Sequence, residues 1–150
     1  MYRWLALCLC IFALPAFSVD ATGTWKLNTT KSKYTGMPMP KDLTATYTPE
    51  GDGWRYAAKG TSATGEPIDS GFNYTKDGED IKTTGFPNWD TLVLQNANTN
   101  KTTGTMKRGG KPVGTLTRTI SSDGKTMTIQ GKVTTPEGKQ ATYMSVYDKQ

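Results

Sequence analysis

From residue 22 onward, the sequence alternates between polar and apolar residues in short runs that are separated by glycine-containing turns. Residues 43–48 read LTATYT, and residues 126–129 read TMTI. Threonine, a β-branched residue, is the most frequent residue, with 26 copies. Strict alternation of β-branched or aromatic residues with a period of two is typical of half-buried β-strands. The pattern therefore favours an all-β fold.

Turn sequences recur about every ten residues along the chain. They lie at 50–53, 76–78, 108–111, 122–124 and 137–138. Their Asp-Gly and Gly-Gly pairs favour the tight turns that join antiparallel neighbours. The sequence thus predicts ten strands near 22–28, 42–49, 53–60, 67–75, 80–85, 90–96, 101–107, 112–121, 125–133 and 139–147. The one long connection, 29–41, contains Pro38 and Pro40 and is predicted to be an irregular covering loop.

A meander of this length must deal with the unpaired edges of its first and last strands. Closure into a barrel removes both edges. We therefore predict a single antiparallel up-and-down β-barrel of about eight to ten strands, in one domain that spans residues 19–150. A β-sandwich is the alternative architecture.

The first eighteen residues differ in composition from the rest of the chain. Arg3 places a positive charge near the start, an uncharged run extends over 5–17, and residues 16–18 read Ala-Phe-Ser. This order is typical of a secretory signal peptide. Because a membrane-spanning helix needs about 20 apolar residues, we expect residues 1–18 to be a cleavable signal-peptide helix, with Ala21 as the second choice for cleavage. The alternative is a retained membrane anchor.

The chain lacks the residue types that many catalytic and metal sites need. Both cysteines, Cys8 and Cys10, lie in the predicted signal peptide, and there is no histidine. Zinc sites of the Cys/His kind and Ser-His-Asp triads are therefore excluded from the mature domain. Asp69 and Asp90 are the only plausible carboxylate pair, and nothing in the sequence brings them together. We predict no enzymatic activity, no metal and no cofactor.

The charge of the chain is modestly basic. It has 18 Lys and Arg against 13 Asp and Glu, a formal net charge of +5. The densest basic segment, KRGGK at 107–111, is either a contact for an anionic partner or the solvated tip of a hairpin. Since the other charges are scattered, we expect no nucleic-acid partner.

Three segments carry a resemblance to a known superfamily. Residues 23–27 read GTWKL, 117–128 read TRTISSDGKTMT, and 146–150 read VYDKQ. Together with the strand pattern and the size, they resemble the lipocalin and fatty-acid-binding-protein superfamily of small barrels. They are most similar to a group of secreted bacterial lipocalin-like proteins of unassigned function. The resemblance spans most of residues 22–150 and implies a lipocalin-like barrel.

The resemblance also implies roles for two residues. In such barrels the tryptophan of the Gly-x-Trp motif seals the closed end, and a basic side chain from a late strand covers it. Trp25 would thus be a structural plug, and Arg118 would cover it through a cation–π contact; alternatively, Arg118 is an internal anchor for an anionic ligand group. The chain departs from fatty-acid-binding proteins at 29–41, where they have a helical lid, and at 143–147, which contains no arginine for a ligand carboxylate.

Six aromatic residues occupy alternating positions on neighbouring predicted strands, so that one face of a closed sheet would bring them together. They are Tyr47, Trp54, Tyr56, Phe72, Tyr74 and Tyr143. With Arg118, they are candidates to line a ligand cavity, or they fill a solid barrel. The segment GFPNWD at 85–90 is either a rim contact for a ligand or partner, or an apolar turn packed over one barrel end.

The sequence therefore predicts an exported binding protein, secreted or periplasmic, whose barrel holds a small apolar or amphipathic ligand. The alternative is a solid-barrel envelope or protein-interaction module that acts through its loops and has no internal ligand. In either case we expect a monomer that does not insert stably into a membrane after cleavage.

Overall fold

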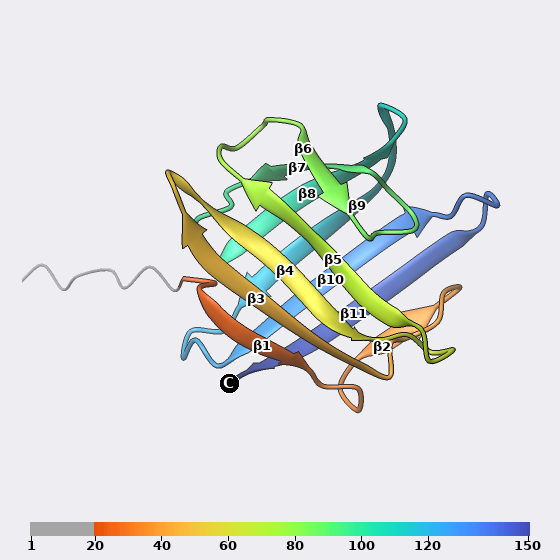
Figure 1. Cartoon of the computed structure of the whole chain (residues 1–150), viewed down its shortest axis with the longest axis horizontal. Helices are drawn as coiled ribbons and strands as arrows, with labels where there is room; N and C mark the ends of the chain where they lie inside the picture. Colours follow the sequence, from red (N-terminus) through yellow and green to blue (C-terminus); the bar gives the residue numbers. More distant parts are fainter. Residues whose placement is uncertain (1–19) are drawn as a thin grey trace, which may run out of the picture.

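The computed structural model describes residues 20–150, which form eleven β-strands (Figure 1). The predicted signal peptide at 1–18 lies outside the described residues. The strands are β1 (Gly23–Leu27), β2 (Lys33–Thr35), β3 (Asp42–Glu50), β4 (Gly53–Thr61), β5 (Pro67–Tyr74), β6 (Ile81–Thr84), β7 (Thr91–Gln95), β8 (Lys101–Arg108), β9 (Lys111–Ile120), β10 (Thr126–Thr134) and β11 (Gln140–Lys149). All ten predicted strands are present, with every end within two residues of its predicted position. Residues 20–150 include no helix that could span a membrane.

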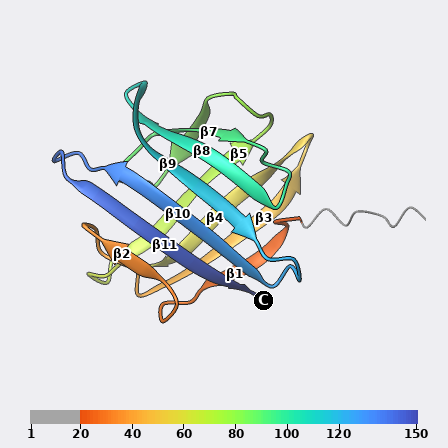
Figure 2. The same ribbon diagram turned by 180° about the vertical axis from the view of Figure 1, so that it is seen from behind.

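The sheet closes on itself. From β3 to β11, each strand pairs antiparallel with the next one along the chain. Strand β1 pairs with β3, where Trp25 lies opposite Ala45, and with β11, where Trp25 lies opposite Lys149. Figures 1 and 2 show the two sides of the resulting barrel. The prediction of a closed antiparallel up-and-down barrel is confirmed, with ten strands in the barrel and β2 as an addition.

Strand β2 corrects the prediction of an irregular loop over 29–41. Its residues 33–35 pair with residues 144–142 of β11. The pairing of β1 with β11 ends at Tyr147, so β2 pairs with the same edge of β11 beyond that point. Strand β11 has ten residues and β1 only five, so β1 leaves part of the β11 edge uncovered. Pairing with β2 satisfies backbone groups along that edge. Residues 36–41 are irregular, as predicted.

Trp25 lies in the core at the end of the barrel where β1 begins. Its ring is fully buried in a cluster that includes Ile120 and Met127, and its indole N–H donates to the carbonyl oxygen of Ala21 at 2.7 Å. The cation over the ring is Lys149, whose Nζ lies 5.2 Å from the ring centroid. The predicted cation–π contact between Arg118 and Trp25 was therefore wrong. Paired residues on adjacent strands project to the same side of a sheet, and this places Lys149 beside Trp25.

The opposite end of the barrel is formed by five connections. They are residues 36–41, 62–66, 85–90, 109–110 and 135–139. We call this end the mouth and the end at Trp25 the closed end.

Candidate functional site

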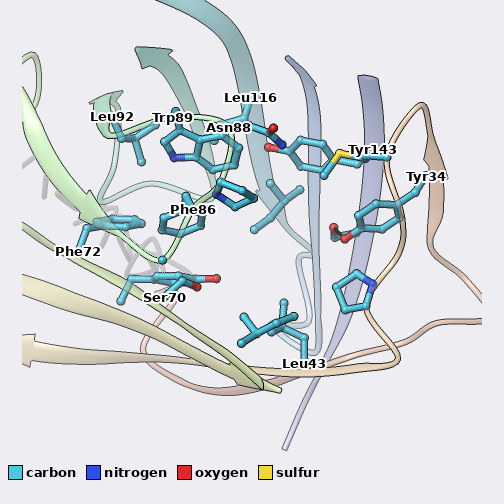
Figure 3. Close-up of a pocket in the computed structure, with 18 of the residues that line it drawn as sticks. Tyr34, Leu43, Ser70, Phe72, Phe86, Asn88, Trp89, Leu92, Leu116 and Tyr143 are labelled. Carbon is cyan, nitrogen blue, oxygen red and sulfur yellow. Dashed lines mark hydrogen bonds between the residues drawn. The ribbon is translucent and has the colours of Figure 1, made fainter. Parts of the chain in front are cut away.

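A cavity of about 490 Å³ lies inside the barrel. It is lined at the mouth by residues from 36–40, 62–63, 85–89 and 135–137, and its lining reaches inward to Arg118 and Thr102. Figure 3 shows Phe72, Phe86 and Trp89 on one side of it and Tyr34 and Tyr143 on the other. The lining is dominated by aromatic and aliphatic side chains, as in sites for small organic ligands.

Six of the seven predicted cavity residues line this space. They are Tyr47, Trp54, Tyr56, Phe72, Arg118 and Tyr143. Tyr74 does not, and its inclusion in the predicted cavity was wrong. It is buried near the closed end, where its ring stacks on Trp54 at 4.8 Å and its hydroxyl donates to Asp77 Oδ1 at 3.0 Å.

Arg118 is a buried cation at the inner end of the cavity, with only 4% of its surface exposed. Its Nη2 donates to the carbonyl oxygen of Ala97 at 2.8 Å and to Thr102 Oγ1 at 2.7 Å. Its buried Nε donates to no acceptor among residues 20–150. The guanidinium also lies over the rings of Tyr47 and Trp54, at 5.3 and 5.7 Å from their centroids.

No carboxylate among the described residues neutralises Arg118. The salt bridges in this part of the chain join Lys31 to Asp148, Lys59 to Asp69, and Lys107 to Asp80. The neighbouring phenol does not compensate either, because burial raises the pKa of Tyr47 above 10, an effect that the charge of Arg118 only partly opposes. Near neutral pH, Arg118 is therefore a desolvated positive charge that faces neutral groups. Such a charge is costly unless an anion or strong acceptor meets it.

Aromatic rings form a continuous wall from Arg118 to the mouth. Tyr47 contacts Tyr56 at 5.2 Å between ring centroids, and Tyr56 stacks on Phe72 at 4.9 Å. Phe86 follows at 6.3 Å from Tyr56 and stacks on Trp89 at 4.8 Å. We call Tyr47, Trp54, Tyr56, Phe72, Phe86 and Trp89 the aromatic wall. Strands β3 to β5 and the 85–90 turn supply these rings.

The other side of the cavity carries a polar group that the sequence did not reveal. Tyr34 Oη and Ser145 Oγ share a hydrogen bond of 2.5 Å, and the Tyr34 ring stacks on Tyr143 at 5.9 Å. Tyr34 was missed because the sequence placed it in a loop. Ser145 alternates with Tyr143 and Tyr147 on β11, which is the signal that could have placed it inside the barrel.

Tyr143 owes its position to a glycine on the next strand. Gly131 is its cross-strand partner, and a Cβ atom at Gly131 would collide with the Tyr143 ring. The absence of a side chain at Gly131 thus allows the ring to lie flat against β10. The cavity retains the volume that the ring would otherwise occupy.

The 85–90 turn is an apolar turn over one barrel end, which is one of its two predicted roles, and it also borders the cavity. It packs over the mouth, and Phe86 and Trp89 line the cavity. Arg108 Nη1 donates to the carbonyl oxygen of Asn88 at 2.8 Å, and the backbone N–H of Gly109 donates to Asp90 Oδ2 at 2.9 Å. The second bond lowers the pKa of Asp90. These bonds tie the turn to the β8–β9 hairpin.

The acidic and basic residues singled out in the sequence serve structural contacts. Asp69 pairs with Lys59 at 3.7 Å on the surface, whereas Asp90 holds the mouth turn, so the two carboxylates form no pair. In the basic segment, Lys107 pairs with Asp80. Within residues 20–150, no group of three or more acidic, cysteine or histidine residues is placed to hold a metal ion.

Comparisons with known proteins identify the fold. No protein-family model matches the sequence, and no curated protein matches it. The structure is similar to zebrafish ileal bile acid-binding protein in complex with cholic acid, with a TM-score of 0.50 and 15% identity over 86% of this chain and 98% of that one. It is also similar to the S-type phycobiliprotein lyase CPES of Guillardia theta, with a TM-score of 0.58 and 10% identity over 87% of this chain and 88% of that one.

The barrel has the lipocalin and fatty-acid-binding-protein fold. At these identities the likeness concerns the fold alone.

Proposed function

We propose that this protein is a binding protein that holds one small amphipathic molecule inside its barrel. The observation that carries the proposal is the cavity of about 490 Å³ with Arg118 buried at its inner end. Cavities of about 300–1,000 Å³ with mostly apolar walls and few polar groups suit small organic ligands. The volume favours the hollow barrel over the solid-barrel alternative.

Arg118 indicates the polar part of the ligand. A guanidinium that is desolvated, unpaired with any carboxylate of residues 20–150 and adjacent to a cavity is stabilised when an anionic group enters. The ligand would place a carboxylate or a similar acceptor near Arg118 and its apolar part along the aromatic wall. Cholic acid, with which the zebrafish neighbour forms its complex, is an amphipathic acid, and this agrees with a fold suited to such guests.

A titration with the fluorescent probe 1-anilinonaphthalene-8-sulfonate tests the binding function. The probe carries aromatic rings and an anionic group, and we expect saturable binding to one site. Binding must be measured on protein whose near-ultraviolet circular dichroism shows fixed tertiary structure, because loosely packed states also bind this dye. Absence of saturable binding of this dye and of other amphipathic acids by the folded protein would contradict the proposal.

The site of action proposed for the barrel is outside the cytoplasm, in the periplasm or beyond the cell. The support is the apolar segment that ends at Ala16-Phe17-Ser18. Exported protein should begin at Val19 or Thr22 and contain no thiol, since Cys8 and Cys10 lie upstream. Intact-mass analysis checks this, and a mass that retains Met1 would oppose it.

A further inference from the structure

We propose that the apolar part of the ligand is a flat, conjugated ring system rather than a flexible alkyl chain. The inference rests on the proposed binding function and concerns the chemical class of the guest. It follows from the continuous run of aromatic rings along the cavity and from an unpaired donor among them.

Four rings of the wall pack against one another as two stacked pairs. Tyr56 stacks on Phe72 at 4.9 Å, with 20° between the ring planes, and Phe86 stacks on Trp89 at 4.8 Å, with 24° between them. The Phe86 centroid lies 6.3 Å from that of Tyr56 and 6.4 Å from that of Phe72, so the two pairs are in contact. All four residues also line the cavity.

An aromatic wall selects for one kind of guest. The edge of an aromatic ring carries partial positive charge and its face carries partial negative charge, so both edge-to-face and offset-stacked contacts between rings are favourable beyond the area that they bury. A flat conjugated guest laid along the wall makes such contacts with several rings at once. An alkyl chain gains only dispersion and burial from the same wall.

The indole of Trp89 supports the same conclusion independently. Its Nε1 is buried and donates to no acceptor among residues 20–150. A buried donor without a partner is costly, and a π face or a ligand oxygen can accept its hydrogen. The unpaired donor belongs to a ring at the mouth that lines the cavity.

The shape of the wall agrees with an elongated guest. The rings continue from Tyr47, beside Arg118, through Tyr56 and Phe86 to Trp89 at the mouth, in steps of 5.2, 6.3 and 4.8 Å between centroids. A ring-bearing acid with its carboxylate at Arg118 would therefore meet aromatic rings along its whole length.

Isothermal titration with three carboxylates tests the inference. Pyrene-1-carboxylate is flat and conjugated, heptadecanoate has the same number of carbons in a flexible chain, and cholate has saturated, non-planar rings. We expect pyrene-1-carboxylate to bind about tenfold more tightly than either of the others, the scale of one or two aromatic contacts. Equal or tighter binding of heptadecanoate or cholate would overturn the inference and leave the binding function intact. Binding of none of the three would count against both.

Two variants test whether the aromatic wall causes the preference for pyrene-1-carboxylate. Phe86→Leu and Trp89→Leu keep apolar side chains in a turn of the mouth and remove the aromatic rings. Each should reduce the preference for pyrene-1-carboxylate over heptadecanoate severalfold. Lys111→Leu, at an exposed position that does not line the cavity, is the control and should preserve it. A preference that is unchanged in both wall variants would show that the stacked rings do not select the guest.

Discussion

The ammonium nitrogen of Lys149 lies 5.2 Å from the centroid of the Trp25 ring, and the two residues are cross-strand partners. The contact joins the first and last barrel strands at the closed end. Trp25 is fully buried, whereas Lys149 is exposed. The ring and the cation should therefore contribute very differently to stability.

Trp25→Ala should lower the free energy of unfolding by about 3–5 kcal/mol, as expected for a large buried aromatic side chain. Lys149→Met should lower it by only about 0.5–1 kcal/mol, the scale of an exposed cation–π contact. Urea unfolding followed by circular dichroism measures both. A loss below about 1 kcal/mol for Trp25→Ala, which is typical of surface positions, would show that this residue is not a plug.

Arg118→Met should separate ligand recognition from folding. The change removes a desolvated charge that has no carboxylate partner among residues 20–150, and two hydrogen bonds from Nη2. Because these effects oppose each other, we expect the free energy of unfolding to change by less than about 1.5 kcal/mol. Affinity for pyrene-1-carboxylate should fall at least about tenfold, whereas the neutral pyrene-1-methanol should bind as before.

Arg55→Met is the matched control for this prediction, because Arg55 is an exposed arginine on β4. It should change neither affinity. If Arg118→Met bound the carboxylate as tightly as the unmodified protein does, Arg118 would have no part in recognising an anionic group.

Alkaline pH should destabilise the barrel through its buried tyrosines. Burial, with a smaller contribution from neighbouring tyrosines, raises the pKa of Tyr56 and Tyr147 well above the usual 10. Below pH 10 these phenols are protonated in both the folded and unfolded chains. Above it they ionise only in the unfolded chain, which then binds fewer protons, so the free energy of unfolding falls by about 1.4 kcal/mol per pH unit for each such tyrosine.

Urea unfolding at a series of pH values above 9 measures this slope, and tyrosinate absorbance follows ionisation in the folded state. Tyr56→Phe should make the slope shallower by the contribution of one tyrosine. An unchanged slope in this variant, or ionisation of Tyr56 near pH 10 in the folded protein, would argue against the assignment.

Gly131→Ala should push the Tyr143 ring away from β10 and into the cavity, because the added methyl group collides with that ring. We expect a loss of about 1–3 kcal/mol in the free energy of unfolding, the usual cost of overpacking, together with weaker binding of pyrene-1-carboxylate. Lys132→Ala, at the exposed position next along β10, should change neither. Adding Tyr143→Leu to Gly131→Ala should restore binding if the displaced ring is the cause.

The strands were predictable because their determinants are local. In LTATYT at 43–48, successive side chains lie on opposite sides of the sheet, so the odd or even position of a residue decides its side. Strand β3 has the expected alternation of buried and less buried positions. The Gly109 and Gly110 pair marks the β8–β9 turn, where both residues have positive φ angles of 57° and 78°. Strand β2 had no such local signal, since only the uncovered edge of β11 explains its pairing.

The candidate site was predictable in part. The alternation of side chains along the strands predicted that Tyr47, Tyr56 and Phe72 line the cavity. It predicted the same for Tyr74, whose ring packs near the closed end instead. Alternation shows on which face of the sheet a side chain lies, and it carries no information about the height of that side chain along the barrel axis.

The sequence by itself determined the strands, the turns, the all-β class and which rings share a face of the sheet, because these follow from residues that are neighbours in the chain. The tertiary structure decided that Lys149 rather than Arg118 covers Trp25, that Arg118 meets no carboxylate among residues 20–150, and that a cavity remains between the rings. These outcomes depend on the register of closure between β1 and β11 and on how side chains from distant strands pack around one volume. Such relationships arise only once the whole barrel has closed.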